Sequence, residues 1–235
     1  MLTLDILIPA RDEAAALPQV LLDLPRAGEG WRVRQVVVVD NGSRDATAEV
    51  ARASGAVLVR EPVAGYGRAC LAGLAHLRAA PPDAVVFLDA DHSDDPGELP
   101  RLVAPLVRGD AVLVIGSRVS AQREPGAFTP AQTLGNWLAP ALLQLFWGVR
   151  ATDLGPFRAV RWEALESLGM RDPDFGWTVE MQARAARARL ATVEVPVSYW
   201  RRRQGRSKIA GTFSGSLRAG VKILGTLARL RLGAE

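Results

Sequence analysis

An apolar segment of the chain runs directly into a group of carboxylates. The stretch AVVFLDADHSDDP, residues 84–96, starts like a buried strand and then carries Asp89, Asp91, Asp94 and Asp95. Like charges at this spacing repel one another, so the group costs stability unless a cation or a helix N-terminus neutralises it. We therefore expect a positive charge beside these acids, in a site that uses them for binding or chemistry.

The segments around this group predict the elements that position it. Apolar, β-branched runs at 3–10, 34–40, 56–59, 84–90 and 111–117 predict short strands in a sheet covered on both faces. The intervening segments 13–25, 44–54, 67–79 and 97–107 carry helix signals. This order predicts a doubly wound α/β fold with a mostly parallel sheet flanked by helices. After a loop at 120–130 we expect a helix, a short linking region and a final amphipathic helix.

Polar stretches follow four of the predicted strands. They are PARDE at 9–13, DNGSRD at 40–45, DADHSDD at 89–95 and GSR at 116–118. Ligands of open parallel sheets bind at the carboxyl ends of the strands, so these stretches are expected to line one crevice. Ordinary turn and N-cap chemistry is the alternative explanation for a stretch such as DNGS.

Composition limits the class of protein. With 235 residues, 49% of them hydrophobic, the chain can bury one sizeable core. Its only cysteine, Cys70, excludes an internal disulfide framework, and the charged N-terminal segment does not resemble a signal peptide. The most apolar window, 128–149, is interrupted by prolines and a glycine. We expect a cytoplasmic protein that does not cross a membrane by itself.

The charges are distributed unevenly along the chain. Residues 1–110 contain 11 basic and 16 acidic residues, whereas residues 111–235 contain 18 basic and 9 acidic residues. Between Arg201 and Arg231 there are nine basic residues and no acidic one. Such a run attracts a phosphate, an anionic membrane surface or a nucleic acid, and a solvated basic face is the simpler alternative.

Five motifs together resemble a known family. ILIPARDE, VVVVDNGSRDAT, FLDADHSDDP, IGSR and TDLGPFRA, in this order, resemble glycosyltransferase family 2 with the GT-A fold. Within it they are most similar to the dolichyl- or polyprenyl-phosphate mannosyl- and glucosyltransferases. The resemblance covers roughly residues 3–210 and implies inverting transfer of a hexose from a GDP-mannose or UDP-glucose type of donor. It implies a GT-A domain at 1–211 and a basic amphipathic helix at 212–235.

The resemblance also implies a donor site. Its nucleotide-sugar-binding residues would be Pro9, Arg11, Glu13, Asp40, Asn41, Gly67, Asp89 and Asp91. Asp89 and Asp91 would hold Mg²⁺ or Mn²⁺, and Asp91 would be the direct ligand. Asn41 stands where the family more frequently has Asp, which leaves the donor base open. Asp94 and Asp95 either belong to the site or cap the next helix, and Gly67 either faces an anion or starts a helix.

The acceptor side follows from the same resemblance. The acceptor-binding residues would be Arg118, Asp153, Arg158, Arg202, Ser207 and Lys208, and the catalytic residues Asp91, Arg118 and Glu180. Glu180 occupies the position of a base in members that transfer to hydroxyls. A phosphate acceptor is already ionised, so Glu180 could instead bind the sugar or cap its helix. Trp177 could stack on a sugar or fill the core.

The C-terminal segment would meet a lipid-linked phosphate. Arg202, Gly205, Ser207 and Lys208 fit an R-x-x-G-x-S-K element that lies beside the acceptor phosphate in similar enzymes. The following helix is predicted to be apolar along Phe213, Leu217, Val221, Leu224 and Ala228, with Arg218, Lys222 and Arg229 opposite. An anionic membrane surface or an integral-membrane partner could bind this helix. Packing on the protein's own core, with a soluble hydroxyl acceptor, is the alternative.

Other classes of protein fit less well. A nucleotidyltransferase typically carries a glycine-rich loop with a lysine after its first strand, which LIPARDE at 7–13 lacks. A nucleic-acid-binding module would explain the basic C-terminal run but not the acidic crevice, so no nucleic acid is expected as a partner. A non-catalytic module is the remaining alternative. His76 and His92 are too few for a histidine metal site.

Overall fold

The structure, a computed structural model, describes residues 1–119, 124–128, 130–202 and 213–232, with only the backbone described at 130–136 and 213–221. Its strands are β1 (Leu2–Ala10), β2 (Ala27–Gly28), β3 (Trp31–Asp40), β4 (Val57–Arg60), β5 (Ala84–Phe87), β6 (Leu113–Ser117), β7 (Arg158–Arg161) and β8 (Thr192–Pro196). Its α-helices are α1 (Leu17–Asp23), α2 (Thr47–Ala53), α3 (Tyr66–Leu77), α4 (Leu99–Arg108), α5 (Pro130–Trp147), α6 (Trp162–Leu168), α7 (Trp177–Arg187) and α8 (Phe213–Leu232). A short 3-10 helix, η1 (Pro96–Glu98), precedes α4.

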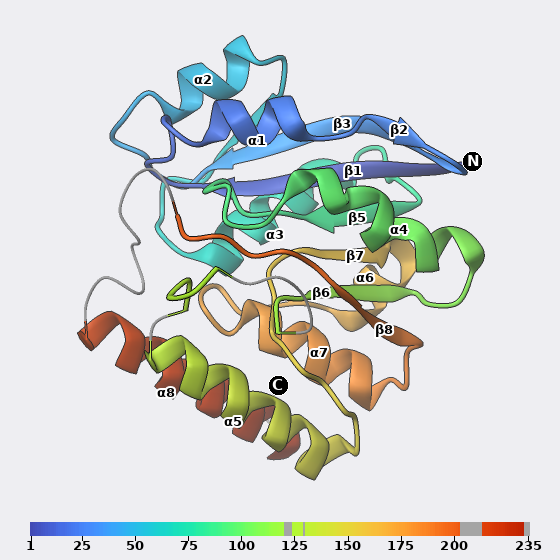
Figure 1. The fold of residues 1–235 in the computed structure, drawn as a ribbon, viewed down its shortest axis with the longest axis vertical. Coiled ribbons are helices and arrows are strands. Elements are labelled where there is room, and N and C mark those ends of the chain that lie inside the picture. The colour runs from blue at the N-terminus through green and yellow to red at the C-terminus, as the bar shows by residue number, and fades with distance from the viewer. Residues whose placement is uncertain (120–123, 129, 203–212, 233–235) are drawn as a thin grey trace.

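One twisted sheet forms the centre of the molecule (Figure 1). Its strand order is β2-β3-β1-β5-β7-β6-β8, and β4 pairs with β3. The pairs β1–β3, β3–β4, β1–β5 and β6–β8 are parallel, whereas β7 runs antiparallel to both β5 and β6. The predicted α/β fold with a mostly parallel sheet is confirmed.

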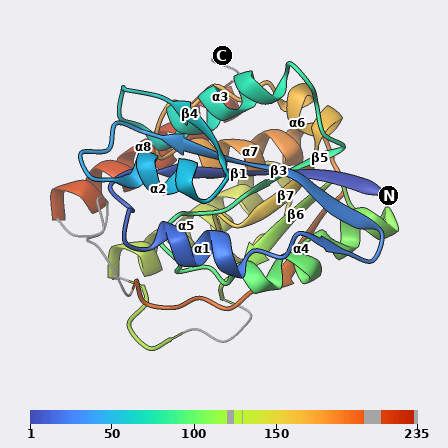
Figure 2. The ribbon, with the colours of Figure 1, turned by 90° about the horizontal axis from the view of Figure 1, so that it is seen from above.

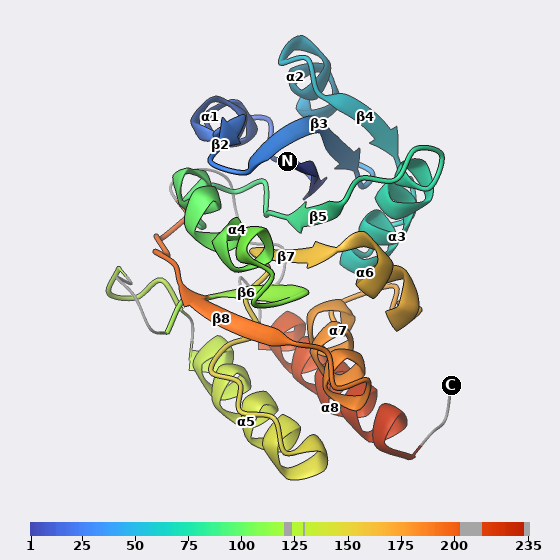
Figure 3. The same cartoon turned by 90° about the vertical axis from the view of Figure 1, so that its right-hand side faces the viewer.

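Helices cover both faces of the sheet. Figure 3 shows α1 and α4 on one side and α3, α6 and α7 on the other, and Figure 2 shows the same layers from above. Alternate strand residues enter the two cores, so that Ile6 and Ile8 pack toward α1 and α4 while Leu7 packs toward α3. These strands are buried on both faces, which explains why their sequences are continuously apolar.

The region after residue 130 contains more structure than the sequence predicted. The expected short linking region in fact includes β7, α6, α7 and β8. The prediction missed β7 because its sequence, RAVR, carries two arginines although it lies in the middle of the sheet. Its arginines bind carbonyl oxygens: Arg158 those of the loop before β7, and Arg161 that of Leu106 in α4.

A third apolar cluster joins α5, α7 and α8 below β8 (Figures 1 and 3). Leu227 and Leu230 of α8 are buried in it together with Leu143 of α5 and Val179 of α7. Leu224 and Ala228, which the sequence placed on the apolar face of this helix, are exposed, and the described part of α8 packs on the core through Leu227 and Leu230 instead. The predicted boundary between residues 211 and 212 lies outside the described residues. Within the described part of the chain, no helix combines the length and apolarity needed to cross a membrane.

Candidate active site

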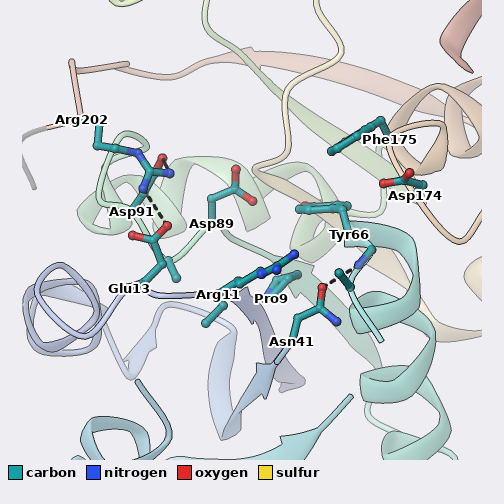
Figure 4. Close-up of a pocket in the computed structure, with 14 residues that line it drawn as sticks. Pro9, Arg11, Glu13, Asn41, Tyr66, Asp89, Asp91, Asp174, Phe175 and Arg202 are labelled. Atoms are coloured by element: carbon teal, nitrogen blue, oxygen red, sulfur yellow. Dashed lines mark hydrogen bonds and ion pairs between the residues drawn. The ribbon is translucent and has the colours of Figure 1, made fainter. Parts of the chain in front are cut away.

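A pocket opens at the carboxyl ends of β1 and β5, as predicted for the crevice of a parallel sheet (Figure 4). The cavity measures about 390 Å³. It is lined by Pro9, Ala10, Arg11, Glu13, Asn41, Ala64, Gly65, Tyr66, Asp89, Ala90, Asp91, Asp174, Phe175 and Arg202. The first, second and third polar stretches predicted from the sequence thus each contribute to one pocket.

Hydrogen bonds hold the loops after β1 and β3 together. The backbone N–H of Asp12 donates to Ser43 Oγ at 3.0 Å, and the N–H of Arg44 donates to Asp12 Oδ1 at 2.7 Å. The N–H of Glu13 donates to Thr47 Oγ1 at 2.8 Å, at the start of α2. Asp12 has a positive φ of 51°, which turns the chain sharply so that its neighbours Arg11 and Glu13 both line the pocket.

The side-chain amide of Asn41 organises the loop before α3. Its Nδ2 donates to the carbonyls of Glu61 at 3.1 Å and Val63 at 2.7 Å, and its Oδ1 accepts from the N–H of Gly65 at 2.8 Å. An aspartate could not donate the first two bonds. The departure from the family's more frequent Asp therefore has a structural role, namely to shape the pocket wall that carries Gly65 and Tyr66.

The two acids of the D-x-D motif differ in their surroundings. Asp89 is half-buried, and its Oδ1 atom is buried with no hydrogen-bond partner among the described residues. Burial, together with the charge of Asp91, raises the pKa of Asp89 from 3.8 to about 7. Asp91 is better compensated, because its Oδ1 accepts from the N–H of Ser93 at 2.9 Å and its Oδ2 from Arg202 at 2.7 Å.

Arg202 supplies the positive charge that the acidic group requires. Its guanidinium donates from Nη1 to Glu13 Oε1 and from Nη2 to Asp91 Oδ2, both at 2.7 Å (Figure 4). Burial opposes this charge, but Asp91 and Glu13 outweigh burial, so the pKa of Arg202 is raised. Arg202 thereby joins the end of the β8 segment to the loops after β1 and β5.

Asp94 and Asp95 have different roles. Asp95 caps η1, with its Oδ1 accepting from the N–H of Gly97 at 2.8 Å. Asp94 is buried, and neither of its carboxylate oxygens has a partner among the described residues. Burial and the neighbouring Asp89 raise the pKa of Asp94 well above its ordinary value. The capping interpretation thus holds for Asp95 only.

The acidic residues fit a divalent ion whose coordination shell is completed by oxygens of a substrate. No group of three or more Cys, His, Asp or Glu side chains that could hold a metal occurs in the described ranges. Mg²⁺ commonly binds through one or two carboxylates together with substrate phosphates, rather than in a cage made by protein alone. The partnerless oxygen of Asp89, beside Asp91 in an open pocket, matches this type of site.

Arg118 and Asp153 form a buried ion pair outside the pocket lining. Arg118 Nε and Nη2 donate to Asp153 Oδ2 and Oδ1, each at 2.7 Å, in a bidentate arrangement. The guanidinium carbon lies 4.9 Å from the ring centroids of both Phe128 and Tyr199. Arg118 is therefore not at the crevice rim where the sequence placed it, although its charge acts on the buried Asp94.

Two further predicted site residues, Arg158 and Glu180, are buried and hold loops in place. Arg158 is fully buried and donates to the carbonyls of Leu154, Gly155 and Thr178, which fixes the loop before β7. Glu180 is also fully buried, and its Oε2 accepts from the N–H groups of Arg171 and Asp172. Its Oε1 accepts from Arg184 at 2.9 Å. Neither residue lines the pocket, and Glu180 anchors the turn before α7, a role that was not predicted from the sequence.

The remaining predicted residues lie outside the pocket lining or outside the described residues. Gly67 lies outside the pocket lining, and a Cβ there would meet the carbonyl oxygen of Asp172 at 1.9 Å, so packing requires this glycine. Asp40 is not a lining residue, and its Oδ1 accepts from the N–H of Ser43. Trp177 is 1% exposed and belongs to the core. Ser207 and Lys208 lie outside the described residues.

Among the lining residues with larger side chains, sequence reasoning missed Tyr66, Asp174 and Phe175. Tyr66 begins α3, directly after Gly65. Asp174 and Phe175 belong to the turn before α7, which reaches the pocket because the N–H of Arg68 donates to the carbonyl of Pro173 at 2.9 Å. The sequence DPDFGW has clear turn chemistry, but nothing in it indicates contact with α3.

An open α/β sheet with an acidic D-x-D pocket at its carboxyl edge defines a nucleotide-sugar-dependent transferase of the GT-A type. The model of the glycosyl transferase family 2 matches residues 5–169, and the chain belongs to this family. It is a hexosyltransferase of family 2. The solved glucosyl-3-phosphoglycerate synthase from Mycobacterium tuberculosis, in complex with phosphoglyceric acid, matches with a TM-score of 0.77 and 27% identity, covering 100% of this chain and 81% of that chain.

The characterised proteins that this chain resembles are named for different acceptors. An uncharacterized glycosyltransferase of Mycobacterium tuberculosis is 39% identical over 90% of this chain and 92% of its own length. The undecaprenyl-phosphate mannosyltransferase of Micrococcus luteus is 31% identical over 95% of this chain and 94% of its own length. The synthase has also been solved with Mn²⁺, UDP-glucose and phosphoglyceric acid, with a TM-score of 0.75, 26% identity and coverage of 97% and 80% of the two chains.

Proposed function

We propose that this protein transfers a hexose from a nucleotide-diphosphate sugar to a polyprenyl phosphate, in one in-line displacement with inversion at the anomeric carbon. The main support for a nucleotide-sugar donor is the pocket at the carboxyl edge of the sheet, which Arg11, Asp89 and Asp91 line together. The solved synthase with UDP-glucose and Mn²⁺ supports this reading by likeness. A bound Mg²⁺ or Mn²⁺ would neutralise the charge that develops on the departing nucleoside diphosphate.

The chain's own residues position the donor. Asp91 and Asp89 would hold the metal, while Pro9, Arg11 and Glu13 form the wall on which the base and ribose would lie. Asp40 remains our candidate for a hydrogen bond to the base, with Asn41 shaping the adjoining loop. The contribution to catalysis is mainly orientation and charge stabilisation in a pocket that already exists.

A phosphate acceptor agrees with the state of the candidate base. The two carboxylate oxygens of Glu180 are buried and already accept hydrogen bonds from three donors. Glu180 is therefore poorly placed to take a proton from a hydroxyl. A phosphate acceptor is ionised at neutral pH and requires no such step. Arg202, Ser207 and Lys208 would bind this phosphate from the C-terminal segment.

The surface at α5 and α8 supports a lipid-linked acceptor. Helix α5 has no charged residue, and Trp137 and Leu145 on it are 69% and 74% exposed. The neighbouring α8 carries exposed cationic side chains at Arg229 and Arg231. An apolar helix beside a basic one is the pattern of a protein surface that rests on an anionic membrane. The undecaprenyl-phosphate mannosyltransferase is a full-length relative with an acceptor of this class.

The proposal is tested with a donor and acceptor screen. GDP-mannose and UDP-glucose are each incubated with the protein, Mn²⁺ or Mg²⁺ and either undecaprenyl phosphate or 3-phosphoglycerate, and products are separated by extraction into organic solvent. Hexose in the lipid fraction is the expected result. Transfer to 3-phosphoglycerate alone would replace the lipid acceptor by a soluble one, as in the solved synthase, and no transfer with any pair would contradict the function.

The metal role has a matched pair of variants. Asp91→Asn should lower turnover by about 100-fold or more, because one charged ligand is lost while the volume is kept. Asp95→Asn is the control, since asparagine preserves the N-cap of η1 and the residue lies outside the pocket lining. Full activity of Asp91→Asn in the presence of a chelator would rule out this metal site.

A further inference from the structure

Arg202 is hydrogen-bonded to the carboxylate of Asp91, which a divalent ion would need as a ligand. Its Nη2 lies 2.7 Å from Asp91 Oδ2, and the other oxygen of Asp91 already accepts from the N–H of Ser93. A divalent ion binds a carboxylate oxygen at about 2.0–2.2 Å, so an ion on Oδ2 would lie within about 5 Å of the guanidinium. Two cations this close repel each other strongly in a partly buried site.

The pocket's charges make Arg202 a substitute for a metal. The side chains of Glu13 and Asp91 are only 7% and 13% exposed, and Arg202 contacts both of them. Without a cation these carboxylates would repel each other and Asp89. Arg202 reaches Asp91 but not the Oδ1 atom of Asp89, which remains without a partner. It is therefore an incomplete substitute, and a divalent ion in contact with both acids would compensate them better.

The backbone beside Arg202 is anchored independently of its side chain. The N–H of Trp200 donates to the carbonyl of Ser93 at 2.8 Å, and Tyr199 forms a β-bridge with Asp94. The guanidinium can therefore leave Asp91 while the chain stays in place next to the acidic loop. Glu13 offers it a second carboxylate, at 2.7 Å, from which it can still face the pocket.

We propose that Arg202 is an internal counter-ion that competes with the divalent metal for Asp91. In the metal-free protein Arg202 holds the acidic loop in place, and metal binding displaces it from Asp91. The released guanidinium is then available to an anion in the pocket, such as a phosphate of the donor or of the acceptor. This inference rests on the proposed function, since it assumes that Asp91 binds the metal, and it assigns Arg202 a role in coupling metal binding to substrate binding.

The inference predicts an unusual direction of change. Arg202→Gln removes a residue from the active pocket, yet Mn²⁺ should bind it more tightly, because no charge-assisted hydrogen bond has to be broken first. The expected decrease in the Kd for Mn²⁺ is about tenfold or more. Arg202→Lys should give an intermediate Kd, since an ammonium is a point charge that does not span both carboxylates in a fixed fork.

The experiment measures Mn²⁺ binding directly, without nucleotide or acceptor. Metal-free wild type, Arg202→Gln and Arg202→Lys are titrated with Mn²⁺, and free Mn²⁺ is read from its electron paramagnetic resonance signal. Arg201→Gln is the matched control, because it removes the same charge one position away while Arg201 donates to Pro125 and not to Asp91. Its Kd should stay within about twofold of wild type, which separates local competition from a general loss of positive charge.

The outcomes distinguish this inference from the proposed function. Equal or weaker Mn²⁺ binding by Arg202→Gln, in a protein whose wild type binds Mn²⁺ and transfers hexose, overturns the counter-ion role and leaves the function standing. Equal tightening in Arg201→Gln also overturns it. Hexose transfer by the wild type in excess chelator, with no Mn²⁺ binding, overturns both the metal role and the inference. Near-ultraviolet circular dichroism of each variant verifies that the native packing is retained.

Discussion

Asp89 is the residue whose protonation should be visible in the stability of the metal-free protein. Its pKa is about 7 in the folded state against an ordinary value of 3.8, because burial disfavours the charged form and Asp91 adds repulsion. Below pH 4 the carboxyl is protonated in both states. As the pH rises from about 4 to 7, the unfolded state loses the proton first, so the contribution of Asp89 to stability falls throughout this interval.

This pH dependence is testable with one substitution. In chelator, Asp89→Asn should gain stability relative to wild type between pH 5 and pH 8, by on the order of 2 kcal/mol, as measured by urea unfolding. Asp89→Asn also removes a charge that helps burial to raise the pKa of Asp94, and this relief adds to the gain in the same direction. A constant difference between the two proteins across this range would contradict a folded-state pKa of Asp89 near 7.

Asn41 offers a second prediction at the level of single residues. Asn41→Asp should destabilise the protein by about 1–3 kcal/mol, because two buried bonds to the carbonyls of Glu61 and Val63 lose their donor. Gln144→Glu is the control, since the same amide-to-acid change there falls on an exposed position of α5. Urea unfolding measures both. Equal effects of the two changes would mean that the amide of Asn41 contributes no specific stabilisation.

The sequence located residues of the donor side better than residues of the acceptor side. The predicted donor residues Pro9, Arg11, Glu13, Asn41, Asp89 and Asp91 line the pocket, because strand ends in a parallel sheet meet at one edge, whereas Asp40 and Gly67 do not line it. Arg202, which was predicted on the acceptor side, also lines the pocket. Arg118, Arg158 and Glu180 do not line it. A charged residue that follows a strand can either line the crevice or take part in a buried hydrogen-bond network. Which of the two occurs depends on the partners that the fold brings near it, and the sequence does not reveal these.

At the scale of elements, periodicity identified the strands of the first half but failed for β7. Those strands are buried on both faces and are continuously apolar, whereas β7 contains Arg158 and Arg161, whose partners come from the preceding loop and from α4. For α8, the sequence left open whether the helix packs on the core or faces a membrane. Both of its faces contain leucines, so the sequence could not tell which face meets α5 and α7.

The packing of α8 yields a prediction with an internal control. Leu227→Ala should lower the free energy of unfolding by about 2–4 kcal/mol, because the side chain is fully buried between α5, α7 and α8. Leu224→Ala, three positions earlier and 38% exposed, should cost less than about 1 kcal/mol. Chemical unfolding monitored by circular dichroism compares the two. The reverse order would mean that α8 packs on α5 and α7 through Leu224 and not through Leu227.

At the scale of the whole molecule, one end of the structure differs from the rest. Helix α5 lies at the opposite end of the long axis from α1 (Figure 1) and packs against the basic α8, and its Trp137 and Leu145 are exposed. Three cationic side chains on the described part of α8, Lys222, Arg229 and Arg231, add charge to this end, although Asp172 partly compensates the first two. A membrane would therefore be approached end-on, with the sheet standing above it.

Liposome flotation tests this orientation. Binding should increase with the fraction of anionic lipid and decrease with salt, and Trp137→Ser should weaken it at least about threefold. Leu22→Ser is the control, because Leu22 is 77% exposed on α1 at the far end. Equal weakening by both substitutions would indicate non-specific adhesion, and unchanged binding of Trp137→Ser would exclude α5 as the contact.

The position of β7 in the sheet also has a consequence for synthesis on the ribosome. β5 and β6 do not pair with each other; β7, which is made much later, fits between them and pairs with both. At the usual rate of translation, the roughly 40 residues that separate β6 from β7 take several seconds to emerge. During that interval the nascent chain presents two unpaired strand edges, so chaperone dependence should be greatest in this window.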